Sequence, residues 1–296
     1  MSAVLVAVAS VKGSPGVTTL CVALAACWPD PAGVVVVEAD PAGGDVAMRF
    51  GLAQSPGLFS LAAATRGGVT PLGSRVENAQ LLWRHAQVLP GDVPVVASPP
   101  DAGRARGALA VLASPEPAGR LAPGPLLAAA EHPGAVLVAD CGRVEPESPA
   151  MPLLRSADVL VLLSGAHADD LAHLARRVPE IGAWSRRPVL LLADRDAHRG
   201  HSIAAVAREL GVAPLARVPF DPRGAAVLSG RRSTLRWHHS GPGRSLLGQS
   251  AREIAELLAP RGPDPSAGRR SDRAGRRRTA RSANGSNGPD VAGRAS

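Results

Sequence analysis

A short stretch near the N-terminus brings together small residues, hydroxyls and the only lysine of the chain. It follows a Val-rich run that is predicted to be a strand, and it leads directly into an apolar helix. Small residues in such a turn expose successive backbone N–H groups, and the helix N-terminus adds partial positive charge. The turn is therefore suited to binding phosphate, with the Thr18 hydroxyl placed to bind a Mg²⁺ ion on the same phosphates. The stretch reads Lys12-Gly13-Ser14-Pro15-Gly16-Val17-Thr18-Thr19.

Acidic residues end two later apolar runs. The run 34–37 leads into Glu38 and Asp40, and another run ends in Asp140. Because parallel sheets bind ligands at the carboxyl ends of their strands, we expect these acids to lie beside the phosphate turn. An Asp there can hold a metal, directly or through water, or position an attacking water. Each feature alone has a simpler explanation, a turn without a ligand or an Asp that caps a helix. Together they favour a nucleotide site.

The elements that must position these residues alternate along residues 3 to 258, which predicts an α/β fold. Nearly continuous apolar runs indicate a doubly wound, mostly parallel sheet of about seven strands. We expect insertions around one strand in the Pro- and Gly-rich stretch 67–123. The expected strands are Ala3–Ser10, Gly33–Glu38, Val93–Ala97, Ala135–Asp140, Asp158–Ser164, Pro188–Ala193 and Pro214–Val218. The expected helices are Val17–Cys27, Gly57–Thr65, Arg104–Ala113, Pro125–Ala130, Asp169–Val178, Ser202–Leu210 and Arg244–Leu258.

Charge divides the chain into two parts. The net charge is +8, and nine Arg against three Asp in 261–296 account for six of these charges, so the remainder is nearly neutral. We expect a nucleotide-binding domain over 1–259 and a disordered basic tail over 260–296, where large apolar residues are almost absent. The tail is a candidate for nonspecific contact with DNA.

Composition also argues against a membrane or secreted protein. The longest apolar runs are of strand length, so we expect no transmembrane helix. The N-terminus has no basic leader ahead of its apolar run, which argues against a signal peptide. Three cysteines in 296 residues form neither a disulfide framework nor a zinc pattern, which indicates a reducing, cytoplasmic compartment.

These motifs resemble those of the MinD/ParA family of P-loop ATPases, whose deviant Walker A motif is KGGxGKTT. The resemblance begins at 12–19, continues through 38–45, includes Asp140 and ends at 218–222. It covers about residues 1 to 258. The segment from Asp45 to Leu52 is similar to that of the CpaE/TadZ-like and septum-site members.

The resemblance implies a cytoplasmic homodimer that binds ATP, with GTP possible, and Mg²⁺, and that positions a protein partner. It makes Lys12 the signature lysine, which reaches the partner subunit's phosphates across the dimer. Asp40 corresponds to the residue that positions the attacking water, and Asp140 to the acid near Mg²⁺, which Thr18 also binds. The residues implied to hold the nucleotide are Gly13, Ser14, Gly16, Val17, Thr18, Thr19, Asp194, Pro219 and Asp221.

Two departures from the family pattern limit this expectation. Val17 stands where the family has its second lysine, so the cation that grips the β- and γ-phosphates is missing and turnover should be slow or absent. An Arg from elsewhere in the fold could compensate, but the sequence does not identify one. Asp194 stands where the family usually has Asn facing adenine, and a carboxylate suits the N–H edge of guanine better.

Three hypotheses stay open from the sequence. The first is a nucleotide-dependent dimerising switch in chromosome partitioning, septum placement or secretion and pilus assembly. The second is a scaffold of the same fold whose phosphate turn is vestigial, which Val17 favours. The third is a DNA-associated accessory protein that binds through its Arg-rich tail.

Overall fold

A computed structural model describes residues 3–13, 15–30, 33–66, 75–114, 124–196, 200–232 and 244–259. These belong to one compact unit that runs to Ala259. The expectations for the tail 260–296, and the DNA hypothesis that depends on it, lie outside the described residues. Ser14 of the phosphate turn lies outside them as well.

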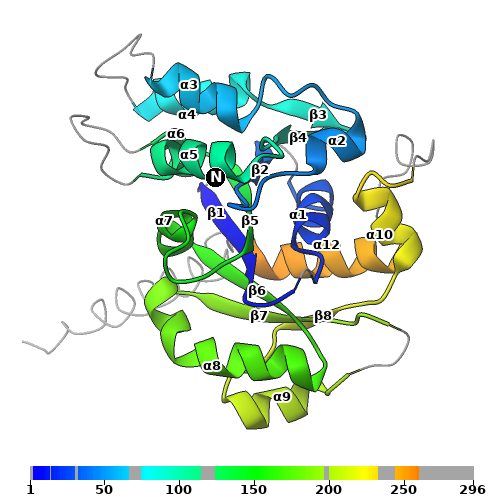
Figure 1. Ribbon diagram of the computed structural model, residues 1–296. Helices are drawn as coiled ribbons and strands as arrows, with labels where there is room; N and C mark the ends of the chain where they lie inside the picture. Colours follow the sequence, from blue (N-terminus) through cyan, green and yellow to red (C-terminus); the bar gives the residue numbers. More distant parts are fainter. Residues whose placement is uncertain are drawn as a thin grey trace, which may run out of the picture. The chain divides into compact units, whose positions relative to one another are not determined.

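The centre of the fold is an eight-stranded sheet in the order β3-β4-β2-β5-β1-β6-β7-β8 (Figure 1). Neighbouring strands are parallel throughout except for β3, which pairs with β4 in the antiparallel direction. The predicted α/β class and mostly parallel sheet are confirmed. The strands are β1 Val4–Ser10, β2 Val34–Glu38, β3 Gln87–Leu89, β4 Val93–Val96, β5 Val136–Arg143, β6 Val159–Gly165, β7 Pro188–Ala193 and β8 Ala216–Val218.

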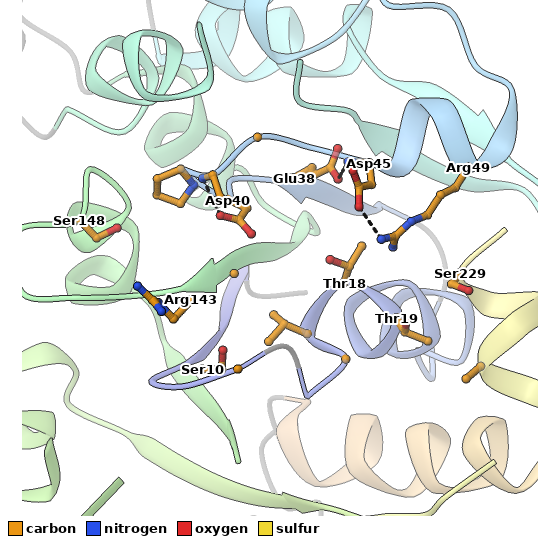
Figure 2. Close-up of a pocket in the computed structure, with 18 of the residues that line it drawn as sticks. Ser10, Thr18, Thr19, Glu38, Asp40, Asp45, Arg49, Arg143, Ser148 and Ser229 are labelled. Atoms are coloured by element: carbon orange, nitrogen blue, oxygen red, sulfur yellow. Dashed lines mark hydrogen bonds and ion pairs between the residues drawn. The ribbon is translucent and has the colours of Figure 1, made fainter. Parts of the chain in front are cut away.

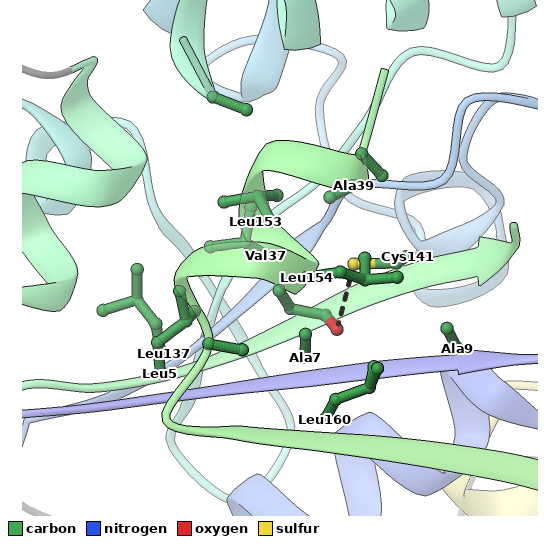
Figure 3. Packing of buried hydrophobic residues seen from close by; sticks show 14 of the residues in the cluster. Leu5, Ala7, Ala9, Val37, Ala39, Leu137, Cys141, Leu153, Leu154 and Leu160 are labelled. Carbon is green, nitrogen blue, oxygen red and sulfur yellow. Dashed lines mark hydrogen bonds between the residues drawn. The ribbon is translucent and has the colours of Figure 1, made fainter. Parts of the chain in front are cut away.

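Helices cover both faces of the sheet, which explains why the central strands are apolar on both sides. In β1, the side chains of Leu5 and Ala7 enter one core cluster and those of Val4 and Val6 enter the other. Figure 3 shows the first cluster, where residues of β1, β2 and β5 pack against the helix that precedes β6. With all seven of its residues buried, β1 is a rigid base for the turn that follows it.

The helices divide between these two faces. One face carries α3 to α9, and the other carries α1 and α12, which lie side by side (Figure 1), together with α2 and α10. No helix among the described residues is long and apolar enough to cross a membrane. The helices are α1 Val17–Ala26, α2 Val46–Phe50, α3 Leu58–Arg66, α4 Arg75–Arg84, α5 Ala102–Leu112, α6 Pro125–Ala130, α7 Met151–Ser156, α8 Ala168–Trp184, α9 Ile203–Leu210, α10 Pro222–Leu228 and α12 Leu246–Leu258.

The structure corrects the expected element list in several places, and it adds the helices α2, α4, α7 and α10, which that list does not contain. The sheet has eight strands, not seven, because the three residues of β3 form an added antiparallel edge. The described part of 67–123 therefore holds two strands, as well as α4 and α5, where insertions around one strand were expected. Strand β5 also continues past Asp140 to Arg143, so this acid lies inside the strand and not at its end.

Candidate functional site

A cleft of about 1040 Å³ opens at the carboxyl ends of the central strands, beside the start of α1 (Figure 2). Its walls come from five parts of the chain. They are the turn after β1, the segment from the end of β2 into α2, Arg106 of α5, the end of β5 with the segment that follows it, and α10 with the residues after it. The residues that line it within these parts include Gly13, Gly16, Val17, Thr18, Thr19, Asp40, Asp45, Arg49, Gly142, Arg143 and Arg231.

The turn between β1 and α1 presents backbone donors to this cleft. Gly13 and Gly16 have φ angles of 67° and 103°, a left-handed conformation that favours glycine. Gly16 is the N-cap of α1, yet no side chain caps this helix and its first turn contains no acid. The unpaired N–H groups at a helix start favour an anion. Ser10, which also lines the cleft, has a buried hydroxyl with no hydrogen-bond partner among the described residues.

The buried carboxylate of Glu38 links the end of β2 to the start of α2 and to the segment after β4. It accepts hydrogen bonds from the backbone N–H groups of Asp45 at 2.8 Å, Val46 at 3.1 Å and Ser98 at 2.9 Å. Burial, together with the charge of neighbouring Asp140, raises the pKa of Glu38 to about 7, although the three backbone hydrogen bonds act in the opposite direction. The carboxylate pins the start of α2 against the sheet.

Asp140 pairs in register with Glu38 and is fully buried behind the cleft. Its Oδ1 accepts the Gly142 N–H at 3.1 Å. Burial raises its pKa to about 6, while the Thr18 hydroxyl, which is close enough to act on the carboxyl, lowers it. Its Oδ2 still has no well-formed hydrogen bond to any described residue. A buried carboxylate oxygen of this kind needs a donor, a water or a cation.

A Mg²⁺ ion fits this arrangement only if further ligands complete its coordination. Thr18 and Asp140 supply one hydroxyl and one free carboxylate oxygen, and the described chain holds no group of three metal-binding side chains. Mg²⁺ is usually held by one or two protein oxygens together with substrate phosphates and waters. The residues present therefore fit a magnesium ion that arrives with a phosphate ligand.

Asp40 lies in the cleft wall opposite the start of α1 (Figure 2). Its Oδ1 accepts the Ala42 N–H at 2.8 Å, and its Oδ2 lies so close over Gly142 that a side chain at that position would collide with it. Burial raises the pKa of Asp40, and the charge of Arg143 lowers it. The carboxylate is thus held in one orientation at the mouth of the cleft.

Four arginines of the described chain line the cleft, and none of them is among the site residues expected from the sequence. Arg143 pairs with Glu145 at 2.8 Å, and Arg106 donates to a backbone carbonyl at 3.3 Å. Arg231 is exposed on the segment after α10. Arg49 is the least exposed of the four, and it forms an ion pair within α2 with Asp45. Only the topology brings these cations to one cleft, so no sequence signal distinguishes them.

Lys12 and Val17 occupy the two positions where the family pattern has lysine. The Lys12 side chain is not part of the cleft wall; its Nζ lies 3.8 Å from Asp169 at the start of α8. Val17 is 5% exposed and packs into the core face that carries α1. The cleft therefore receives no lysine from the turn in this structure.

A second, smaller pocket of about 140 Å³ lies next to the cleft and shares Gly16, Thr19, Pro222 and Ala225 with it. Its wall is mostly apolar and includes Pro219, one of the residues that the family resemblance implies for the nucleotide. A ligand with a charged end and an aromatic end could therefore extend from one pocket into the other.

Asp194 and Asp221 also line this second pocket, but their carboxylates are already engaged. Asp194 forms an ion pair with Arg217, which contacts both of its carboxylate oxygens. Asp221 caps α10 through the Gly224 N–H at 2.9 Å and accepts the Leu247 N–H of α12 at 3.1 Å. Both carboxylates are therefore already bound by groups of the protein. The contacts of Asp194 with Arg217 do not support the preference for guanine that was expected from this residue.

Comparison with known proteins agrees with this architecture at the level of the fold. A ParA family ATPase from Chlorobium tepidum TLS superposes with a TM-score of 0.61 at 17% identity, over 87% of this chain and 99% of that one. The cell division ATPase MinD of Pyrococcus furiosus gives 0.60 at 18%, over 86% and 98%. The septum site-determining protein MinD of Pyrococcus horikoshii, complexed with Mg-ADP, gives 0.59 at 18%, over 89% and 96%.

No protein-family model and no curated protein matches the sequence. The likeness is therefore carried by structure, at identities too low to transfer an activity. The TM-scores and the near-complete coverage of the solved chains lead to one conclusion: this chain has the fold of the MinD/ParA-like P-loop ATPases.

Proposed function

We propose that the protein binds a magnesium nucleotide, preferably ATP, in the cleft at the start of α1 and uses it as a dimerising positional switch. The observation that carries the proposal is the uncapped N-terminus of α1, which opens into a cleft that also holds Asp40 and borders Asp140. Such a helix start favours phosphate, and the neighbouring apolar pocket has room for part of a base.

Each end of the nucleotide has residues suited to it. The backbone of 16–19 would hold the phosphates, while Thr18 and Asp140 would hold Mg²⁺, which neutralises phosphate charge when bound. Pro219 and the apolar wall around it would take the base. The MinD of Pyrococcus horikoshii is complexed with Mg-ADP, which supports a nucleotide of this class. Because both oxygens of Asp194 contact Arg217, adenine is preferred to guanine in the proposal.

Hydrolysis is proposed to be slow or absent. Asp40 is fixed at the cleft mouth, where it can orient an attacking water. A buried Val17 leaves the turn without the cation that stabilises charge in phosphoryl transfer. Binding, not turnover, would then set the state of the switch.

Lys12 is proposed to act between two copies of the chain. Its side chain lies outside its own cleft and forms one loose ion pair, with Asp169 at 3.8 Å, so little holds it in place. This position agrees with a lysine that reaches the phosphates of a partner subunit. The cargo of the switch, in partitioning, septum placement or secretion, is left to the cellular context.

The test is a titration of the purified protein with Mg-ATP that follows affinity and molecular mass together. We expect wild type to bind and to dimerise on binding, and Lys12→Ala to bind as a monomer. Arg208→Ala, which removes an exposed cation of the loose pair with Glu209 on α9, is the matched control and should behave as wild type. Absence of nucleotide binding by wild type at millimolar concentration would sink the proposal.

The alternative is a scaffold of the same fold with a vestigial phosphate turn. The buried apolar side chain of Val17 in place of the P-loop lysine is the observation that favours it. In that case wild type, Lys12→Ala and Val17→Lys would show the same mass with and without nucleotide.

A further inference from the structure

The cleft needs a cation that the phosphate turn does not supply. Val17 puts an apolar side chain at the start of α1, and Lys12 lies outside the cleft. A polyphosphate bound there would face the unpaired N–H groups of α1 without a charged side chain from the same turn. Any compensating charge must come from another part of the wall.

Arg49 is the cleft arginine best placed to supply it. Figure 2 shows its side chain extending from α2 toward the start of α1, where Thr18 lies. Arg143 lies at the far side of the same cleft, beside Asp40 and Ser148. The Arg49 side chain is 25% exposed whereas that of Arg143 is 60% exposed, so Arg49 reaches deeper into the wall.

The Arg49 guanidinium keeps donors that its ion pair does not use. The guanidinium uses one nitrogen, Nη2, to bind Asp45, and its other N–H groups bond to no described residue. Free N–H groups of a guanidinium fit phosphate oxygens in a fork, which an ammonium group cannot do.

The position of Arg49 is set before any ligand arrives. Glu38 pins the first turn of α2 through the N–H groups of Asp45 and Val46, so the short helix is tied to the end of β2. At the other end of α2, Gly230 lies against the Arg49 carbonyl so closely that a side chain there would collide with it. The ion pair with Asp45 then fixes the side chain itself.

We propose that Arg49 replaces the missing P-loop lysine: from α2 it binds the terminal phosphates of the nucleotide over the start of α1. This inference rests on the proposed function, and it adds the residue that makes binding possible with valine at position 17. The competing explanation is an ordinary ion pair within one helix, which would affect folding slightly and binding not at all.

The experiment measures Mg-ATP affinity for wild type, Arg49→Gln, Val17→Lys and the double variant. Gln removes the charge and leaves an uncharged polar side chain. Arg177→Gln is the matched control, because Arg177 forms a similar pair with Glu180 on α8, outside the cleft. We expect Arg49→Gln to weaken binding about 10- to 100-fold and the control to change it less than about twofold.

The double variant separates a phosphate contact from a general loss of structure. If Lys at position 17 takes over the same phosphates, the loss from Arg49→Gln should shrink to about threefold or less in that background. Equal affinity of Arg49→Gln and wild type would overturn the inference and leave the proposed function standing. Failure of wild type to bind would overturn both. Should Arg49→Gln unfold at lower temperature than wild type, Arg49→Lys, which restores the charge but not the fork of N–H groups, must still bind Mg-ATP more tightly than Arg49→Gln, and equal affinity of these two variants would also count against the inference.

Discussion

Replacement of Val17 by lysine should make the protein less stable without nucleotide and more stable with it. The Val17 side chain is 5% exposed and packs on the core beneath α1. Burial of a valine contributes about 1.5 kcal/mol or more. The lysine stem can recover part of this by lying along the same apolar surface while its head reaches the cleft. The free energy of unfolding without ligand should therefore fall by about 1 kcal/mol.

With nucleotide bound, the lysine should raise the free energy of unfolding by more than it lowers it without nucleotide. A hydrogen bond to a charged phosphate contributes about 1.5–3 kcal/mol, which corresponds to about 10- to 100-fold tighter binding. Because a ligand stabilises the folded state in proportion to the logarithm of its concentration over Kd, a gain of this size adds about 1.4–2.7 kcal/mol at saturating nucleotide. The order of stability of the two proteins should then reverse.

Urea unfolding with and without saturating Mg-ATP, together with direct titration, measures both effects. Val17→Met is the control, since methionine has similar reach and no charge. It should lose little stability and gain no affinity. If Val17→Lys binds no more tightly than Val17→Met, then the terminal phosphates do not lie over the start of α1, and the argument from the helix N-terminus is wrong.

Three further outcomes follow from buried contacts and from the tail. The native pKa of Glu38, about 7, lies above its ordinary value of 4.5, so its contribution to stability is complete below pH 4.5 and is lost as pH rises through 7. Urea unfolding from pH 5 to 8, without Mg²⁺ or nucleotide, should show this loss of about 3 kcal/mol, and Glu38→Gln should flatten the slope by about one proton; parallel slopes would contradict it. Gly44→Ala should cost about 1–3 kcal/mol because its new methyl group meets the held Glu38 carboxylate, whereas Gly107→Ala within α5, where nothing lies within 4 Å, should gain about 0.5–1 kcal/mol in the same assay. Deletion of 261–296 should leave Mg-ATP affinity unchanged and remove salt-sensitive DNA binding in a filter assay, and persistence of that binding would locate it in the folded part.

The sheet could be predicted where its strands are long and buried on both faces. Val34–Glu38 and Val159–Gly165 are buried at every position, and continuous apolar sequence reports such burial directly. Strand β3 was not predicted because it has three residues, of which only one is buried. An antiparallel strand at the edge of the sheet does not need a continuous apolar sequence. Helix α10 is missing from the expected list because the family resemblance assigns 218–222 to the nucleotide site, although an N-cap Asp followed by proline is also a helix start.

The candidate site was predictable where it lies on the turn and on the strand ends, and not where it depends on packing. The residues 16–19 and Asp40 line one cleft, as expected from the shared edge of a parallel sheet. The pairing of Asp194 with Arg217 joins residues that the sequence does not connect, because it depends on the parallel register of β7 and β8. Arg49 is one of 32 arginines, and only the short turn from β2 into α2 aims it at the cleft.

The buried Glu38 side chain also links two segments of the chain. One of its oxygens holds the first turn of α2, and the other holds Ser98, sixty positions along the chain and just past β4. A displacement of α2 by a phosphate at Arg49 would therefore be transmitted through this carboxylate to the segment that follows β4, the strand next to β2. Loss of the Glu38 contacts would leave the hydrogen bond from the Gly44 N–H to the Pro99 carbonyl, at 2.9 Å, as a remaining link between the two segments.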